Sequence, residues 1–421
     1  MTVRKFRKGR NMDSRSEAEK YPVSRSCPVC GGREAKLLQL MEFAGETGCV
    51  LPNCYRIVTC RNCGFVYDDV DVEAGIFEQY YRNCAKYAAF GVGGAGELTA
   101  ADRLRYRALV EFVSSVLTAE MTIADVGCGK GGLLRFLYEN GFKRVVGIEP
   151  SPGCVEIIRN HLKLEAVCSD ISSLQSGRQF DLVIASNVLE HIFNLRDAVG
   201  RLSGLVAAGG LIALEVPDAS RYVQFPHAPY YYFDMEHINH FDLNSMRSLW
   251  LSAGFEIVAE EEATGFPVEG MEIPMCRLLV RKRISEAESG QSALLPVMTS
   301  ERVRQYIEWS QGVEQALPGK PENRREFFLW GCGAYAKWFL RNKISAESPA
   351  GIVEVNAGKV GALVDGCPVI SPEMLLNRNS GDGAVMISSV LYERQIHRQL
   401  KELGWRGAVL SACRAQGKPE A

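Results

Sequence analysis

The sequence predicts an α/β protein with a mostly parallel sheet at its centre, a small cysteine-rich unit before it and a smaller α/β unit after it. The first observation is a series of short, wholly apolar runs between helical stretches, at 123–126, 145–148, 181–185 and 211–214. Strands that are apolar on both faces are typical of parallel sheets covered by helices on both sides. The second observation is that four cysteines form two Cys-x2-Cys pairs near the N-terminus.

The length and charge of the chain narrow its class. A chain of 421 residues is long for a single core, so we expect two or three domains. Its 48 Lys and Arg residues nearly balance its 50 Asp and Glu residues, which leaves no broad basic field for nucleic acid. No apolar run approaches the roughly 20 residues that cross a bilayer, and the basic N-terminus lacks the apolar segment of a secretory signal. We therefore expect a cytoplasmic protein with no membrane or nucleic-acid partner.

Changes in composition divide the chain into five segments. Residues 1–24 are polar and charged without periodicity, which predicts a disordered tail. Residues 25–85 are rich in Cys and Gly, with too little apolar material for a core of their own. Residues 86–282 alternate helical and strand-like stretches, and residues 283–300 have the composition of a linker. The alternation restarts over residues 301–415, which we expect to form a Rossmann-like second domain.

A glycine-rich segment follows the first apolar run and precedes a helical stretch. It reads Asp125-Val126-Gly127-Cys128-Gly129-Lys130-Gly131-Gly132. Glycines let the backbone turn tightly and approach a ligand closely. The spacing also fits a dinucleotide fingerprint, with Glu149 ending the next strand to hold ribose hydroxyls. However, the carboxylate of Asp125 would repel a pyrophosphate and attract an ammonium group. This position favours a ligand with a methionine moiety over a dinucleotide.

Polar residues after the next two strands complete an ordered series. They read Cys168-Ser169-Asp170-Ile171 after the third strand and Ser186-Asn187-Val188-Leu189-Glu190-His191 after the fourth. Over about 150 residues this series resembles the class I S-adenosylmethionine-dependent methyltransferases. The resemblance implies a Rossmann-like, mostly parallel seven-stranded sheet with S-adenosylmethionine as cofactor. We expect Glu190 and His191 to begin a helix and to have a structural role.

The same resemblance assigns the cofactor-binding residues. Glycines would line the methionine end, Glu149 would hold the ribose, Asp170 and Ile171 would flank adenine, and Asn187 would lie near the sulfonium. With Asp125 at the ammonium, the expected set is Asp125, Gly127, Gly129, Gly131, Glu149, Asp170, Ile171 and Asn187.

The two cysteine pairs predict a structural zinc site formed by Cys27, Cys30, Cys60 and Cys63. A glycine follows the second cysteine of each pair and can take positive φ, so that the two thiolates converge on one ion. The loop between the pairs is longer than usual, and Cys49 and Cys54 within it offer alternative ligands. Buried free cysteines and a redox pair are the other interpretations. Two matched pairs in a chain without a secretory signal favour a shared metal.

A four-cysteine unit, a class I core and a second Rossmann-like domain together resemble the sugar C-methyltransferases that act on nucleotide-linked keto-deoxysugars. The resemblance covers roughly residues 25–415. It implies that the outer domains close over a substrate at the core, and that carbon is methylated through an enolate. The C-terminal turn Gly331-x-Gly333 could bind a second nucleotide, but substrate docking or a structural turn is the expected role.

Enolate formation requires a base, and a His of near-neutral pKa suits that proton transfer. Glu236-His237 aligns with the Glu-His of this family, whose His is the proposed base. We therefore expect His237, Glu236 and Tyr232 to be catalytic, with His240 the next candidate.

The sequence departs from the family in two motifs. The family's Tyr-His-Glu-His appears as Asp234-Met235-Glu236-His237, and its Gly-Gly-Ser appears as Gly270-Met271-Glu272. These changes do not affect the residues expected to bind the cofactor, but they concern the motifs expected to recognise a keto sugar. The alternative is therefore O- or N-methylation of another small metabolite or saccharide. Base N-methylation is disfavoured because Ser186-Asn187-Val188-Leu189 lacks the Asn/Asp-Pro-Pro-aromatic motif. A non-enzymatic scaffold is disfavoured by the intact acidic residues at 125, 149 and 170.

Overall fold

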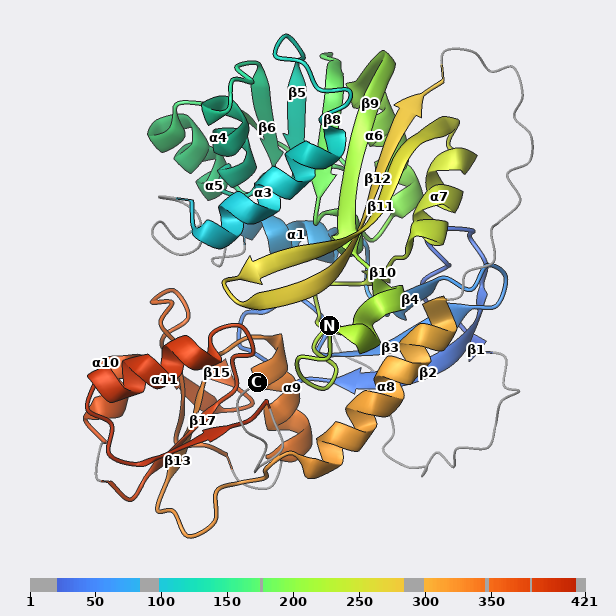
Figure 1. The fold of residues 1–421 in the computed structure, drawn as a ribbon. Coiled ribbons are helices and arrows are strands. Elements are labelled where there is room, and N and C mark those ends of the chain that lie inside the picture. The colour runs from blue at the N-terminus through green and yellow to red at the C-terminus, as the bar shows by residue number, and fades with distance from the viewer. Residues whose placement is uncertain are drawn as a thin grey trace.

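The computed structural model describes residues 21–83, 98–174, 177–283, 299–344, 348–378 and 381–413. Their strands form three sheets, with the largest sheet above the other two in Figure 1. Most of the predicted tail 1–24 and of the predicted linker 283–300 lies outside the described residues. Strand pairing already begins at Tyr21, inside the predicted tail.

The N-terminal sheet has the order β1-β2-β3-β4-β10, with every neighbouring pair antiparallel. Its strands are β1 (Tyr21–Pro22), β2 (Glu34–Glu42), β3 (Cys54–Cys60), β4 (Val66–Asp69) and β10 (Asn239–His240). The last strand comes from the loop that carries His237. The cysteine-rich unit therefore shares a sheet with the central part of the chain. The helix α1 (Gly75–Asn83) follows β4 in the sequence.

The central sheet has seven strands in the order β11-β12-β9-β8-β5-β6-β7. They are β5 (Ile123–Val126), β6 (Val145–Glu149), β7 (Glu165–Cys168), β8 (Phe180–Ser186), β9 (Val206–Pro217), β11 (Phe255–Val268) and β12 (Met271–Lys282). The five strands from β9 to β7 are parallel, and β12 runs antiparallel to both of its neighbours. The mostly parallel seven-stranded sheet is confirmed. Every residue of β5 and β6 is buried, as expected for strands covered on both faces.

Helices cover both faces of this sheet (Figure 1). They are α3 (Ala100–Val113), α4 (Gly132–Glu139), α5 (Pro152–Ile157), α6 (Leu195–Leu205) and α7 (Leu243–Ser252). The short helical turns η1 (Ile158–Leu162), η2 (Leu189–His191) and η3 (Ala219–Gln224) lie in the connections of this part of the chain. The expectation that Glu190 and His191 begin a helix is not met, because they end the three-residue turn η2 and the next helix, α6, begins at Leu195.

The third sheet has the order β15-β16-β14-β13-β17-β18 and is parallel except for the pair β15-β16. Its elements are α8 (Thr299–Ala316), β13 (Phe327–Trp330), α9 (Ala334–Lys343), β14 (Gly351–Val353), β15 (Leu363–Val364), β16 (Cys367–Ile370), α10 (Pro372–Leu376), β17 (Ala384–Ile387), α11 (Glu393–Glu402) and β18 (Ala408–Ser411).

The helix α8 connects this part of the chain to the rest. The hydroxyl of Tyr306 donates to the carbonyl of Ala228 at 3.1 Å, and the N–H of Tyr230 donates to Ser310 Oγ at 3.1 Å. A buried ion pair between Lys337 and Glu46 joins α9 to the loop that follows β2 of the N-terminal sheet. The apolar side chains of these parts form one continuous core. Among the described residues, no helix is both long and apolar enough to cross a membrane.

Candidate active site

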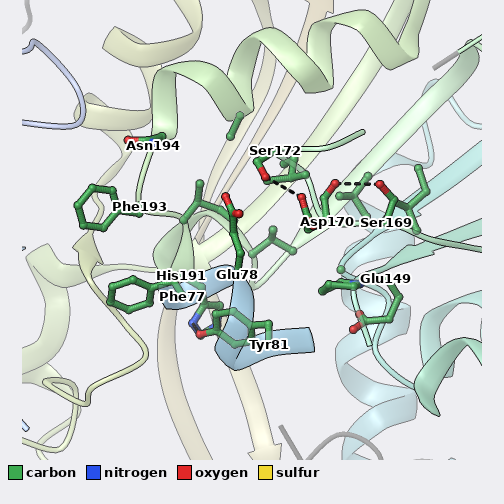
Figure 2. Close-up of a pocket in the computed structure, with 18 of the residues that line it drawn as sticks. Phe77, Glu78, Tyr81, Glu149, Ser169, Asp170, Ser172, His191, Phe193 and Asn194 are labelled. Atoms are coloured by element: carbon green, nitrogen blue, oxygen red, sulfur yellow. Dashed lines mark hydrogen bonds between the residues drawn. The ribbon is translucent and has the colours of Figure 1, made fainter. Parts of the chain in front are cut away.

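A cavity lies at the carboxyl ends of β5, β6, β7 and β8, with α1 beside it (Figure 2). Ligands of open α/β sheets bind at this edge, where loops leave the parallel strands. The cavity is lined by Ala74, Phe77, Glu78, Tyr81, Val126, Gly127, Gly129, Ile148, Glu149, Pro150, Ser169, Asp170, Ile171, Ser172, Asn187, Val188, His191, Ile192, Phe193, Asn194, Asp197 and Ala198. Six of the eight residues predicted to bind the cofactor are among them, and Asp125 and Gly131 are not.

The glycine loop has two kinds of position. Gly127 and Gly131 have φ of +70° and +82°, and a Cβ on them would lie 2.6 Å from Val188 Cγ2 and 2.8 Å from Ile158 Cγ1. Both glycines therefore allow close packing in a conformation that other residues rarely adopt. Gly129 has φ of +53° and open space beside its Cα. Gly131 precedes the first residue of α4 and is not among the residues that line the cavity, so its role at the methionine end stays a prediction.

Glu149 ends β6 and fixes the loop. Its Oε2 accepts the N–H of Gly129 at 2.9 Å, and its Oε1 accepts the N–H of Ser151 at 3.0 Å. Burial raises the pKa of Glu149, although the two backbone N–H groups oppose this shift. Each carboxylate oxygen keeps a further lone pair toward the cavity, where the sequence predicts a ribose.

Asp125 lies beneath the loop and is 4% exposed. Burial, followed by the charge of Glu149, raises the pKa of Asp125 to about 8. The carboxyl group therefore holds a proton at neutral pH. A cation beside it would favour the carboxylate and displace that proton.

The predicted adenine end contains an anion that α1 already contacts. Asp170 Oδ1 accepts the hydroxyl of Ser172 at 2.6 Å and the N–H of Ser173 at 2.8 Å, and Oδ2 accepts Arg82 Nη2 at 2.8 Å. Burial opposes ionisation, but the hydrogen bonds from the two serines and Arg82 lower the pKa of Asp170 to about 2. An adenine amino group would share this carboxylate with Arg82.

The side chain of Asn187 is oriented by a chain of hydrogen bonds. Its Nδ2 donates to Ser186 Oγ at 3.1 Å, and that hydroxyl donates to Glu215 Oε1 at 2.8 Å. The other oxygen of Glu215 accepts Arg277 Nε at 2.6 Å, and this ion pair is buried. Asn187 has φ of +55°, a left-handed conformation that Asn tolerates better than most residues. The residue predicted to lie near the sulfonium is thus held in the cavity wall.

Two contributors to the cavity were missed in the sequence. The helix α1 provides Phe77, Glu78 and Tyr81, which Figure 2 shows entering from one side. His191 also lines the cavity, although we expected it to be structural. The aromatic residues near 77–81 were the available signal, but they fall in the segment assigned to the zinc unit.

His191 is the centre of a cluster with Glu190, Glu236 and His237, which we call the imidazole cluster. His191 Nδ1 lies 2.8 Å from the hydroxyl of Tyr81 and 2.9 Å from the carbonyl oxygen of Glu236. The ring of His237 meets that of His191 edge-on, with centroids 4.7 Å apart. Burial, and next the charge of His237, lower the pKa of His191 to about 4, so its imidazole is neutral.

The predicted catalytic residues lie in two different places. Glu236 and His237 join the imidazole cluster, although His191 rather than His237 lines the cavity. Tyr232 is 4% exposed, its ring stacks on Tyr222 at 4.1 Å, and its hydroxyl donates to the carbonyl of Phe225. The expectation that Tyr232 lies at the active site is not met, because its apolar ring packs in the core under α8.

The next candidate base, His240, does not line the cavity either. It is fully buried in the N-terminal sheet, and its Nε2 lies 3.1 Å from Asp68 Oδ1. Among the described residues that line the cavity, His191 is therefore the only histidine.

The four predicted zinc ligands converge as expected. The Sγ atoms of Cys27, Cys30, Cys60 and Cys63 all lie within 4.8 Å of one another. The sulfurs of Cys27 and Cys63 are 3.6 Å apart, and those of Cys30 and Cys60 are 3.4 Å apart. Two matching turns bring them together, since Gly31 and Gly64 have φ of +76° and +77°. Cys49 and Cys54 do not belong to this group.

Known proteins are similar to the part of the chain that forms most of the central sheet. A family model described as a methyltransferase domain matches residues 99–260. A ubiquinone biosynthesis O-methyltransferase of Methylobacterium sp. (strain 4-46) is 33% identical over 99 residues, which are 22% of this chain and 39% of that protein. A trans-aconitate 2-methyltransferase of Methylobacterium radiotolerans is 31% identical over 119 residues, 27% of this chain and 45% of that protein. The chain thus spans less than half the length of these curated relatives.

Solved structures include the N-methyltransferase NodS from Bradyrhizobium japonicum WM9 in complex with S-adenosyl-L-homocysteine. It matches 49% of this chain and 98% of its own, with a TM-score of 0.37 and 15% identity. The family match runs from the residue before α3 into β11 and so includes the glycine loop, Glu149, Asp170 and Asn187. Residues 99–260 are a methyltransferase domain of the class that uses S-adenosylmethionine. The three-domain resemblance to the sugar C-methyltransferases stays a prediction.

We expect Asp125→Asn to weaken S-adenosylmethionine binding by about 2–5 kcal/mol, because a neutral amide cannot pair with the buried ammonium group. Isothermal titration calorimetry measures this directly. The matched control is Asp71→Asn, which removes an exposed carboxylate and should leave the affinity unchanged.

The pH dependence follows from the same group. Binding must displace the proton that Asp125 holds with a pKa of about 8, so the affinity of the wild type should rise from about pH 6 to about pH 8. The rise should disappear in Asp125→Asn. Equal affinities in wild type and variant would move the ammonium partner to another residue.

Proposed function

We propose that this chain transfers the methyl group of S-adenosylmethionine to a small-molecule acceptor that binds beside His191. One observation carries the proposal. A single cavity contains most of the predicted cofactor residues and continues to the imidazole cluster. The lining cofactor residues are Gly127, Gly129, Glu149, Asp170, Ile171 and Asn187.

The reaction requires the acceptor to attack the methyl carbon in line with its bond to sulfur. That bond breaks, its electron pair stays on sulfur, and S-adenosylhomocysteine is formed. The acceptor must also lose a proton, and a neutral imidazole suits that transfer. His191 is neutral and lies at the cavity, with His237 in contact behind it. The group that receives the proton therefore belongs to this pair, and its assignment to His237 remains a prediction of the sequence.

The narrower proposal for the acceptor is a nucleotide-linked keto-deoxysugar that is methylated at carbon through an enolate. Glu236 and His237 lie next to the cavity wall, as that chemistry requires. Glu236 Oε1 also accepts the hydroxyl of Tyr80 at 3.0 Å, which holds the carboxylate in place.

Methylation of an oxygen is the second candidate. Asp234 stands where the sugar enzymes have Tyr, and its Oδ1 accepts the N–H groups of Glu236 and His237 at 2.7 and 2.8 Å. Asp234 therefore shapes the loop instead of offering a hydroxyl to a substrate. The names of the relatives, an O-methyltransferase among them, agree with this candidate.

We also propose that Cys27, Cys30, Cys60 and Cys63 hold a structural zinc ion. Four thiolates about 2.3 Å from one ion lie roughly 3.8 Å apart. This is close to the sulfur separations of 3.6 Å between Cys27 and Cys63 and 3.4 Å between Cys30 and Cys60. A closed set of four thiolates leaves no open position for a substrate, so the ion would stabilise the fold. The N-terminal sheet that it supports carries β10, directly after the loop of the imidazole cluster.

The role of the imidazole cluster can be tested with a keto-sugar nucleotide in heavy water. With S-adenosylhomocysteine present, the enzyme should exchange the α-hydrogen for deuterium, since deprotonation does not need the methyl donor. His237→Ala should slow exchange and methyl transfer by roughly 10²–10⁴-fold while S-adenosylmethionine affinity is kept.

His161→Ala, which changes an exposed histidine, is the control and should behave as the wild type. Exchange that persists in His237→Ala would assign the proton transfer to another group. Methyl transfer to a hydroxyl with no exchange on any keto sugar would favour the oxygen acceptor.

Metal analysis of the purified protein should find about one zinc ion per chain. Cys30→Ser should lose the zinc and speed hydrogen exchange over residues 25–83, because one ligand of four is removed. Cys168→Ser, which changes an exposed cysteine outside the cluster, should keep it. Carefully prepared protein without zinc would contradict the proposed centre.

A further inference from the structure

We propose that Glu190, His191 and His237 bind a second, divalent metal ion at the acceptor side of the cavity. The inference rests on the proposed methyl transfer and names what activates the acceptor. The ligating atoms of these three residues all lie within 4.8 Å of one another. No residue of this group belongs to the four-cysteine site.

The carboxyl group of Glu190 is the first reason. Glu190 is 1% exposed, and neither of its oxygens has a hydrogen-bond partner in the part of the chain that the structure describes. A buried polar group without a partner is costly, and buried carboxylates are normally paired or bound to a metal. A cation at this position would provide the missing partner.

The geometry of His191 is the second reason. In the tautomer that carries the proton on Nδ1, His191 donates to the carbonyl oxygen of Glu236, which can only accept, and the Tyr81 hydroxyl 2.8 Å from the same nitrogen also accepts. The lone pair of His191 is then on Nε2, which lies 3.9 Å from Glu190 Oε1. Metal-binding histidines commonly donate their other N–H to a backbone carbonyl in this way.

The distance between His191 and Glu190 fits two ligands of one ion better than a direct hydrogen bond between the two side chains. The separation of 3.9 Å between His191 Nε2 and Glu190 Oε1 is too long for a hydrogen bond. Two ligands about 2.1 Å from one ion lie roughly 3.0–3.4 Å apart, so the two side chains would move together by about 0.5–0.9 Å around it.

His237 completes the set from the other side. Its backbone is fixed by the bond to Asp234, and its ring contacts His191 edge-on. Within the described residues, its ring nitrogens have no hydrogen bond. His237 does not line the cavity itself, and an ion shared with His191 would connect it to the acceptor.

Two imidazoles and one carboxylate form a site for a divalent first-row metal ion, such as Mn²⁺, Fe²⁺ or Zn²⁺. Three protein ligands leave positions open for an acceptor that presents an oxygen. An ion-bound hydroxyl or enolisable carbonyl loses its proton more readily. Because both imidazoles are then ligands of the ion, that proton passes to water instead of to the histidine pair. The resulting oxyanion or enolate attacks the methyl group. The bond from the methyl carbon to sulfur breaks, and the sulfonium becomes a neutral thioether. The substrate class is therefore an acceptor with an oxygen at, or next to, the methylated atom.

Binding of Mn²⁺ tests the site, because this ion binds thiolates poorly and does not report on the cysteine centre. Chelator-treated protein that keeps its zinc is titrated with Mn²⁺ and followed by electron paramagnetic resonance. We expect one saturable site per chain, with spin-echo modulation from imidazole nitrogen. Glu190→Gln and His237→Gln should each weaken binding at least tenfold.

His161→Gln is the matched control and should bind as the wild type. Unsaturable Mn²⁺ binding by the wild type, or equal binding by the Glu190 and His237 variants, would overturn the site. Thermal unfolding of each variant shows whether a loss reflects misfolding. Failure of the site is separable from failure of the proposed function, since S-adenosylmethionine binding and methyl transfer are measured on the same chelator-treated protein. Methyl transfer without the ion would overturn the metal site alone.

Discussion

The candidate site depends on the backbone of Ile238, which is bonded on both sides. Its N–H donates to the carbonyl of Glu190 at 2.8 Å, and its carbonyl accepts the N–H of Asp68 at 3.0 Å. The guanidinium of Arg25 donates to the same carbonyl at 3.1 Å, and burial lowers the pKa of Arg25 to about 10 without removing its charge at neutral pH. One residue thus ties η2 of the methyltransferase domain to β4 of the N-terminal sheet, and His237 immediately before it is placed beside His191.

The sequence reveals the features that depend on local patterns. The apolar runs of β5, β6 and β8 are buried on both faces, and the positive φ of Gly127 and Gly129 favours glycine. Contacts between distant segments could not be predicted in this way. Tyr81 meets His191 across 110 positions of the sequence, so neither pattern indicates the other. Tyr232 shows the opposite error, because an aromatic residue next to an active-site loop can equally fill the core.

The third sheet repeats the arrangement of the cofactor loop. Gly331 has φ of +112° after β13, and the N–H of Cys332 donates to Glu354 Oε2 at 3.2 Å, as Gly129 does to Glu149. Here, however, a Cβ on Gly331 would lie 3.2 Å from Ser389, and Lys359 donates to the carbonyl of Cys332. These contacts agree with a structural turn, which is one of the two roles expected from the sequence beside substrate docking. A hydrogen bond from a loop N–H to a Glu at the end of the next strand thus occurs at the cavity of the central sheet and at the Gly331 turn of the third sheet.

The central claim is that S-adenosylmethionine binds between α1 and the carboxyl ends of β5 to β8. Hydrogen–deuterium exchange with and without S-adenosylhomocysteine tests it over the whole chain at once. The account predicts slower exchange in residues 126–132, 148–151, 168–172 and 75–83, and no change in residues 330–334 and 351–356. Protection of the third sheet instead, or no protection of α1 and the glycine loop at saturating ligand, would contradict it.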